Sequence, residues 1–252
     1  MSGHSKWSSI KHRKAAADAK RGQLFTKLAR ALTVAAREGS GDPDANHTLA
    51  AAIEKARSYS MPKDNIQRAI DRGTGEGDAG AAIERVIYEG YGPGGVAVLV
   101  EALTDNRNRT SAEIRHAFDK HGGSLGEPGS VAWQFHKKGA ITVDALRHSE
   151  DDLLVAIDAG AEDVSADGDQ LRVLTPAEDL AAVRSALAEA GVEVASAELA
   201  MEPGAVVEVT DEAEARALMR LMDALDEHDD VDSVHANFDI PETVIEEAEA
   251  AA

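Results

Sequence analysis

The sequence predicts a multidomain α+β protein, in which an N-terminal three-helix domain precedes two α+β, ferredoxin-like domains, one inserted in the other. Two observations predict this class. Before the glycine-rich segment 73–80, apolar residues recur at the spacing of amphipathic helices. After it, short β-branched runs alternate with helical patterns, which is typical of sheets with helices packed on one face. A chain of 252 residues has room for two or three such domains.

A long amphipathic helix is predicted over residues 22–38. Four apolar residues fall on one face at helical spacing: Leu24, Leu28, Leu32 and Ala35. Residues 1–21 have no comparable stripe, so we expect a partly helical, partly mobile arm there. The arm and the helical domain together are assigned to residues 1–77.

Two further helices are predicted to complete the first domain. One spans about 44–59, with Asp42 or Asp44 as its candidate N-cap. The other begins near Pro62, a residue suited to a helix entry, and is expected to end at Gly73.

The segment 73–80 is interpreted as a linker that leads into alternating strands and helices. We assign residues 81–133 and 203–241 to one α+β domain, residues 134–202 to the inserted one, and residues 242–252 to an acidic, alanine-rich tail. Strands are predicted at 84–90, 95–103, 130–135, 140–143, 162–166, 170–174, 192–201, 205–210 and 231–238. Helices are predicted at 108–123, 149–160, 175–191 and 211–228.

Charge is distributed unevenly along the chain. Residues 1–75 hold 14 Lys and Arg against 7 Asp and Glu, whereas residues 141–252 hold 5 against 30, and the whole chain carries −20. An acidic body with a basic end indicates a polyanionic partner that approaches at that end. The alternative is an ordinary solvated surface. The candidate nucleic-acid-binding residues are Lys6, Trp7, Lys11, His12, Arg13, Lys14, Lys20, Arg21, Lys27 and Arg30.

A second candidate contact is the segment TDNRNRT, residues 104–110, which joins a strand to a helix. Arg107 and Arg109 fall near the helix N-terminus, where backbone N–H groups favour anions. One interpretation is a phosphate contact. The other is an internal ion pair with Glu101 or Asp105.

Other classes of function find little support in the sequence. Without cysteine the chain has no disulfide and no thiolate metal site, and its histidines contain no H-E-x-x-H pattern. Its G-x-G-x-x-G matches lie outside the strand–turn–helix context that a dinucleotide site needs. The carboxylates of residues 223–233 are interpreted as a solvated helix end rather than a cation site. We therefore predict no enzyme activity, no cofactor, no metal and no membrane association.

Five segments together resemble the YebC/PmpR family over residues 2 to about 241. They are GHSKWSSIKHRKAAADAKRGQLFTKLARALTVAAREGSGDP, KARSYSMPKDNIQRAI, YEGYGPGGVAVLVEALTDNRNRTSAEIRHAF, GGSLGEPGSVAWQF and LMDALDEHDDVDSVHANFDIP. The resemblance implies three domains and a non-enzymatic role in gene expression. The family is described as probable DNA-binding transcriptional regulators; its mitochondrial relatives are translational activators, and bacterial members are also linked to translation. The motif begins at Gly3, so we expect a bacterial, cytoplasmic protein.

The leading hypothesis is a DNA-binding transcriptional regulator. The alternative is a translation factor that contacts ribosomal RNA or tRNA on the ribosome. The sequence shows no convincing helix-turn-helix, zinc finger or basic zipper, which favours contact with the nucleic-acid backbone over readout of base edges. RNA therefore fits the residues as well as DNA does. A monomer is favoured.

Overall fold

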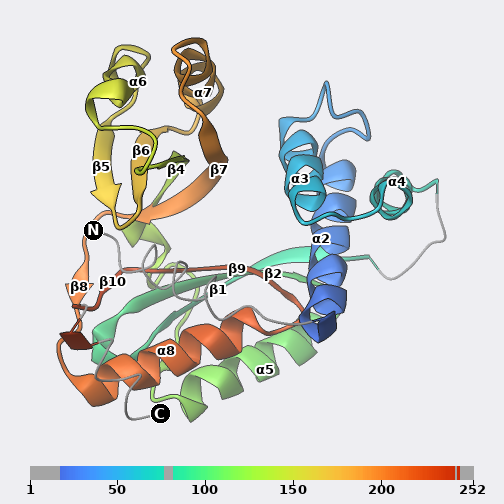
Figure 1. Cartoon of the computed structure of the whole chain (residues 1–252). Coiled ribbons are helices and arrows are strands. Elements are labelled where there is room, and N and C mark those ends of the chain that lie inside the picture. Colours follow the sequence, from blue (N-terminus) through green and yellow to red (C-terminus); the bar gives the residue numbers. More distant parts are fainter. Residues whose placement is uncertain (1–17, 77–81, 242, 245–252) are drawn as a thin grey trace.

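The computed structural model describes residues 18–76, 82–241 and 243–244, with side chains from residue 22 onward except that of Asp167. Figure 1 shows three bodies, a group of packed helices and two sheets, each sheet with helices on one face. The predicted α+β class, with a three-helix domain and two α+β sheets, is confirmed. No helix among the described residues is long and apolar enough to cross a lipid bilayer.

The helical domain is built from α2 (Asp18–Glu38), α3 (His47–Ser58) and α4 (Lys63–Thr74). The predicted apolar stripe of α2 faces the other two helices, and Leu32 and Leu49 are completely buried there. The core is aliphatic, as the scarcity of aromatic residues requires. It also contains Leu28, Ile53, Met61, Ile66 and Ile70.

The N-cap of α3 is Asn46, so the prediction of Asp42 or Asp44 was wrong. The Asn46 side-chain oxygen accepts from Leu49 N at 3.1 Å. Its amide nitrogen donates to the carbonyls of Ala35 and Ser40, both at 2.8 Å. A carboxylate could make the cap but could not donate to those carbonyls, so asparagine suits a cap that also ties α3 to the end of α2.

Helix α4 passes through Gly73 and ends at Gly75, which has a φ of 84°. The prediction that Gly73 ends the helix was therefore wrong by two residues. Gly73 is required for another reason, because a Cβ there would lie 2.4 Å from the Thr33 carbonyl oxygen of α2. The glycine permits α2 and α4 to pack closely.

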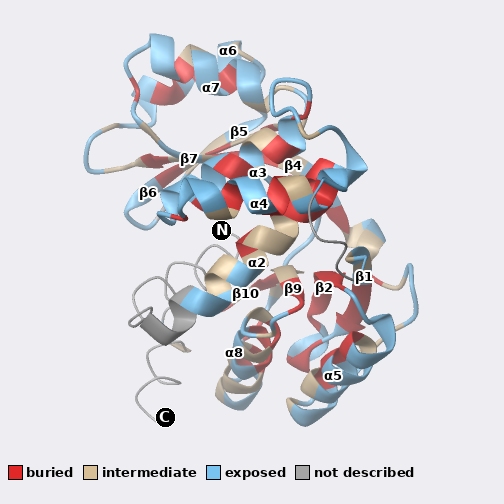
Figure 2. Ribbon diagram, turned by 90° about the vertical axis from the view of Figure 1, so that its right-hand side faces the viewer, coloured by how far each residue is buried: buried red, intermediate tan, exposed pale blue. Residues whose placement is uncertain are grey.

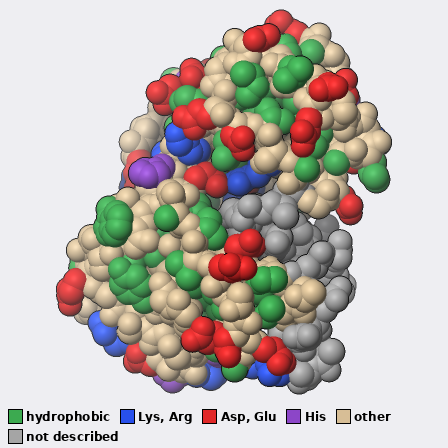
Figure 3. Space-filling view, turned by 90° about the vertical axis from the view of Figure 1, so that its left-hand side faces the viewer, with side chains coloured by type: hydrophobic (Ala, Val, Ile, Leu, Met, Phe, Trp, Pro, Cys, Tyr) green, Lys and Arg blue, Asp and Glu red, His purple; other side chains and the backbone are tan. Residues whose placement is uncertain are grey.

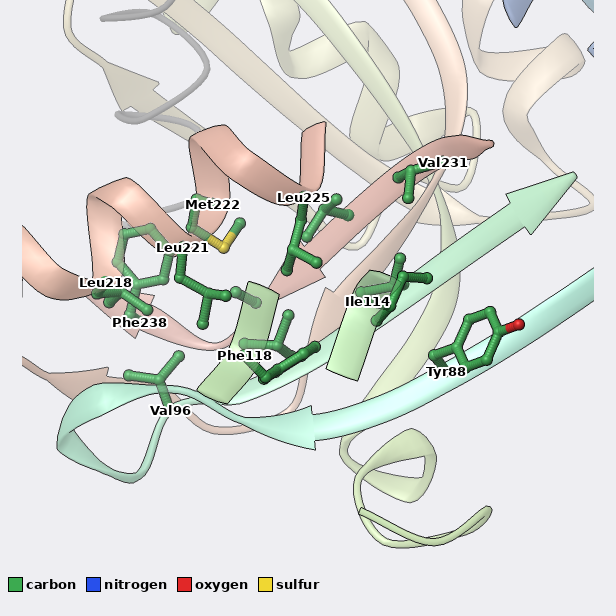
Figure 4. Close-up of a cluster of buried hydrophobic side chains, with 14 of the residues drawn as sticks. Tyr88, Val96, Ile114, Phe118, Leu218, Leu221, Met222, Leu225, Val231 and Phe238 are labelled. Atoms are coloured by element: carbon green, nitrogen blue, oxygen red, sulfur yellow. The ribbon is translucent and has the colours of Figure 1, made fainter. Parts of the chain in front are cut away.

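The first sheet is antiparallel, in the order β3-β1-β2-β9, and two helices cover one of its faces. Figure 4 shows the apolar side chains of the helices and strands meeting between the two layers. The strands of the first sheet are β1 (Glu84–Tyr91), β2 (Ala97–Thr104), β3 (Ser124–Leu125) and β9 (Val231–Ala236). The two helices that cover it are α5 (Arg107–Lys120) and α8 (Glu212–Asp226).

The second sheet is formed by residues 135–203, in the order β5-β6-β4-β7. Its sequence of elements is βαββαβ, and with this strand order it has the ferredoxin-like topology. The first sheet departs from that order, because its chain begins with the β1–β2 hairpin. The members of the second sheet are β4 (Phe135–Asp144), α6 (Leu154–Asp158), β5 (Asp163–Asp167), β6 (Gln170–Pro176), α7 (Leu180–Glu189) and β7 (Val194–Pro203).

Two predicted strands differ in the structure. Residues 130–135 form a turn of 3-10 helix, Ala132–Gln134, that leads into β4. The amides of Val131 and Ala132 donate to the Glu89 carboxylate instead of entering a ladder. The strand predicted at 205–210 is reduced to β8 (Val207–Glu208), which pairs in parallel with β10 (Phe238–Asp239).

The two sheets are joined by a small apolar cluster on the face of the first sheet that its helices leave uncovered. Ala97 and Leu99 of β2 pack there with Val131 and Phe135. In Figure 2 the buried residues lie inside each body, where the helices and strands face one another. The position of residues 131–135 is therefore determined by tertiary packing.

Candidate nucleic-acid interface

The structure describes the side chains of only part of the predicted interface. Lys6, Trp7, Lys11, His12, Arg13 and Lys14 lie outside the described residues. Lys20 and Arg21 belong to the first turn of α2, and their side chains are likewise outside the description. The geometry can be followed for four candidates: Lys27, Arg30, Arg107 and Arg109.

Lys27 and Arg30 of α2 point toward the domain of the first sheet, which we call the central domain. Lys27 Nζ donates to the carbonyl of Asp226 at the end of α8. Arg30 Nη1 donates to the carbonyl of Asp229 at 2.7 Å and to Asp230 Oδ1 at 2.6 Å. Two of the predicted phosphate contacts thus attach the helical domain to the acidic turn between α8 and β9.

Asp230 is the centre of this attachment and is only 3% exposed. Its Oδ2 accepts from Arg109 Nη2 at 2.7 Å and from the Thr110 hydroxyl at 2.6 Å. Burial by itself would raise the pKa of Asp230, but the hydrogen bonds from Thr110 and Arg109 and the charges of Arg30 and Arg109 lower the pKa to about 2. At neutral pH the group is a carboxylate that joins α2, α5 and the α8–β9 turn.

The acidic segment 223–233 is a helix end with one buried member. Asp223, Glu227 and Asp229 are exposed, as a solvated helix end requires, whereas Asp230 is not. Ligand atoms of Glu113, His228 and Asp230 lie within 4.8 Å of one another. Since guanidinium groups and a hydroxyl already bind the Asp230 oxygens, we do not interpret this group as a metal site.

Arg107 and Arg109 lie differently at the start of α5. The helix is capped by Asn106, whose side chain accepts from Arg109 N at 3.2 Å. Arg109 is bound by Asp105 at 3.0 Å as well as by Asp230. Arg107 projects outward with its side chain 68% exposed, and its guanidinium lies 3.9 Å from Glu84. Arg107 is the more accessible of the two to a phosphate.

Of the two predicted internal partners of these arginines, one pairs with Arg109 and the other does not pair with either arginine. Asp105 pairs with Arg109, while Glu101 pairs instead with Arg85 of β1 at 3.0 Å. The strongest contact of Arg109, to Asp230, had no local signal in the sequence, because the two residues are 121 positions apart.

Arg107 and the entry of the arm lie at the same end of the molecule. Arg30 and Arg109 share one carboxylate, so the start of α5 lies against α2 about three turns from the first residue of that helix. Figure 1 shows the N-terminal end of α2 beside the ends of α5 and α8. The first residue of α2, Asp18, therefore lies on the same side of the molecule as the start of α5, about three helical turns along α2 from Arg30.

Further cations that sequence reasoning did not assign lie on the helical domain. Four are exposed, and no ion pair is seen for them among the described residues: Lys55, Arg57, Lys63 and Arg72. Lys55 and Arg57 occupy the last turn of α3, where cations also favour the helix dipole. The signal that could have found them is the net positive charge of residues 1–75, which extends beyond the arm.

Carboxylates are common on one face of the two-lobed molecule. Figure 3 shows one face of the molecule, with carboxylates scattered over both the upper and the lower lobe. This agrees with the charge of residues 141–252, where Asp and Glu outnumber Lys and Arg by 30 to 5. Residues 141–252 therefore repel a polyanion on balance.

Two family models together match nearly the whole chain. Residues 5–76 match the model of the TACO1/YebC protein N-terminal domain. Residues 83–238 match the model of the TACO1/YebC second and third domain. The boundary between these models falls at the segment that joins α4 to β1.

Individual proteins are similar over their full length. A probable transcriptional regulatory protein of Rubrobacter xylanophilus is 58% identical over 98% of this chain and 99% of its own. One from Desulfotalea psychrophila is 55% identical with the same coverage. The crystal structure of a conserved hypothetical protein from Aquifex aeolicus superposes with a TM-score of 0.81 at 48% identity, covering 89% of this chain and 93% of that one.

Proposed function

The chain belongs to the TACO1/YebC family of probable transcriptional regulatory proteins, which are not enzymes, and we propose that it regulates transcription by binding DNA through its basic N-terminal end. The observation that carries the proposal is the separation of charge. Basic residues gather at one end, against an acidic body. A polyanion is attracted to that end and is on balance repelled by residues 141–252.

The fold supports two different roles for the basic residues, one structural and one in binding. Lys27 and Arg30 are engaged by the α8–β9 turn and position α2. The proposal assigns phosphate contacts to six arm cations: Lys6, Lys11, Arg13, Lys14, Lys20 and Arg21. Arg107 would add a contact from the central domain. Contacts of this kind position a nucleic acid without reading its base sequence.

A second candidate function is a translation factor that binds ribosomal RNA or tRNA. It is favoured because the interface offers Lys and Arg for the backbone, and because no recognition helix carrying base-reading side chains was identified in the sequence. Both candidates place the protein in the cytoplasm, where its nucleic-acid partner would be.

One experiment decides between the two candidates. The protein is crosslinked to its ligands in living cells, and the attached DNA and RNA are sequenced. Enrichment of promoter DNA is the expected result, whereas enrichment of ribosomal RNA or tRNA would support the second candidate. A full-length variant with the six arm cations changed to serine is the control and should lose the enrichment. If the variant and the natural protein recover the same background, nucleic-acid binding through the arm is refuted.

A further inference from the structure

A tryptophan is exposed at the junction between the two sheets. Trp133 lies in the 3-10 turn immediately before β4 and is 72% exposed. Tryptophan is largely buried on average in folded proteins, because its ring is the largest apolar surface among the side chains. The exposure of Trp133 therefore calls for an explanation.

The backbone on both sides of Trp133 is fixed. Val131 and Phe135 are buried in the cluster that joins the sheets. The carbonyl of Gln134 accepts from Gly204 N at 2.8 Å, and the Gln134 side chain binds Asn237. The turn presents the indole outward while its neighbours anchor inward.

A buried carboxylate holds the preceding loop. Glu89 of β1 is 7% exposed, and its oxygens accept from the amides of Gly129 at 2.6 Å and of Val131 and Ala132, both at 2.7 Å. Burial would raise the pKa of Glu89, but these backbone donors outweigh it and lower the pKa below its ordinary value. A charged group with three donors fixes the loop strongly.

The polar atoms of the two exposed aromatic side chains, Trp133 and Tyr91, form hydrogen bonds within the protein. Trp133 Nε1 donates to the Ser130 carbonyl at 3.1 Å, and the Tyr91 hydroxyl donates to the same oxygen at 3.0 Å. Tyr91 is 37% exposed. Two aromatic side chains thus meet at one oxygen, and what they offer to a ligand is ring surface.

We propose that Trp133, with Tyr91 beside it, is a stacking platform for an unpaired base of a single-stranded nucleic acid. Stacking suits a partner with a flat π-face and tolerates any base sequence. The proposal rests on the proposed function, which supplies the nucleic acid, and extends it to a second contact surface and to unpaired strands.

The small size of this surface favours a single base over a protein. His136 and Lys137, just after the turn, are both exposed. The nearby Glu202 is already paired with Arg172. The loop before Trp133 also exposes Glu127 and Pro128, so the apolar area is about that of the rings and one proline. A stable protein interface buries roughly 800 Å² on each partner.

The platform is separate from the basic end. Strand β1 runs from Glu84, next to Arg107, to Tyr91. Eight residues of extended strand span about 24 Å. A single strand held by the arm and Arg107 would have to extend along the molecule to reach Trp133, and a change at Trp133 leaves the basic end intact.

The test uses full-length protein with Trp7→Phe, which leaves Trp133 as the only tryptophan. Its fluorescence is followed during titration with oligo(dT), oligo(U) and a blunt DNA duplex of equal length, and binding is measured by anisotropy of labelled oligonucleotides. We expect the single strands, but not the duplex, to quench Trp133. In the natural background Trp133→Ala should weaken single-strand binding about 10- to 100-fold and leave duplex binding unchanged. Trp133→Phe should retain most of the affinity.

Leu146→Ala is the matched control, since Leu146 is 86% exposed and apolar. If single strands and duplex both bind and Trp133→Ala behaves like Leu146→Ala, the stacking inference is overturned and the aromatic surface is assigned to a protein partner. Equal weakening of single-strand and duplex binding also overturns it. If the natural protein binds neither, the proposed function fails as well, so the two failures are distinguishable. Preference between oligo(dT) and oligo(U) identifies the type of strand.

Discussion

At the scale of single residues, Asp230 shows how one buried carboxylate can organise three segments. It accepts from Arg30 of α2 and from Arg109 and Thr110 of α5. Removing one member of a buried, hydrogen-bonded ion pair usually costs more than the pair contributes, because the remaining charge is left without its partner. The site should therefore be sensitive to substitution.

The pH dependence of stability tests the state of Asp230. Its pKa is lowered from 3.8 to about 2 in the folded protein. A lowered acid pKa stabilises the fold above the unfolded value, and that stabilisation is lost as pH falls from about 4 toward 2. The loss from this group is roughly 2 kcal/mol. Asp230→Asn should reduce the free energy of unfolding at pH 7 by about 3 kcal/mol and flatten its decline at low pH.

Urea denaturation at pH 7, 5, 4 and 3 measures this effect. Asp229→Asn is the control, because the Asp229 side chain is exposed and Arg30 is bound by its backbone carbonyl. The control should match the natural protein. An Asp230→Asn variant with an unchanged pH profile would contradict the assignment of the lowered pKa.

The two arginines at the start of α5 should separate binding from stability. Arg107→Ala removes one exposed cation, so nucleic-acid affinity should fall about fivefold. The slope of log affinity against log salt concentration should become shallower by about 1, and the free energy of unfolding should change by less than about 0.5 kcal/mol. Arg109→Ala leaves Asp230 short of a partner and should destabilise the fold by about 2 kcal/mol. Anisotropy and urea denaturation on both variants measure the two effects. Similar results for the two variants would refute the distinction.

At the scale of elements, α2 contributes to the core of the helical domain and also attaches that domain to the central domain. One face packs against α3 and α4. Lys27 and Arg30 contact the α8–β9 turn, and Arg37 donates to the carbonyl of Ile83. Arg85 of β1 also approaches Glu38 at the end of α2. The helical domain is therefore docked by polar contacts at several points along one helix.

Limited proteolysis tests this attachment. Elastase cleaves after small residues, and segment 77–81, which contains Ala79 and Ala81, connects two separately packed cores. We expect the first cut there, with the two fragments still co-eluting in gel filtration at low salt. In an Arg30→Ala variant the fragments should separate at a lower salt concentration than in the natural protein. First cleavage inside the α+β region would contradict the separate packing of the helical domain.

At the scale of the whole molecule, charge decides where a polyanion can approach. Residues 141–252 carry 30 acidic and 5 basic residues, so the basic N-terminal end is where a polyanion is attracted most strongly. Repulsion by the body would orient the complex and suppress non-specific contacts.

Salt dependence measures the contribution of the arm. If about six cations neutralise phosphates, the slope of log affinity against log salt should be about −5 for duplex and about −4 for single strands, with binding weakened about 10³-fold between 50 and 200 mM salt. Deleting residues 1–21 should flatten the slope and remove most of the affinity. Thermal stability should change little, because the buried residues described in α2 begin at Leu28. Unchanged affinity and slope would assign binding to another surface, such as the exposed cations of α3 and α4.

Local patterns determined much of the fold. The stripe at Leu24, Leu28 and Leu32 predicted α2, and the apolar runs 84–90 and 95–103 on either side of a glycine-rich turn predicted β1 and β2. These signals are local, because they depend only on residues close together in the sequence. The residue that caps α3 was not predicted correctly from the sequence. Asn46 caps α3 because it can also donate to carbonyls at the end of α2, and that second requirement is not local.

By itself the sequence determined the order of the elements, the helical and α+β character of their regions and the separation of charge, since each depends on composition or short-range period. Only the tertiary structure decided that Arg30 and Arg109 share Asp230, at separations of 200 and 121 residues, and that Trp133 is exposed while Val131 and Phe135 are buried. The physical reason is that periodicity specifies which face of an element is apolar. It does not specify which distant carboxylate or surface that face will meet.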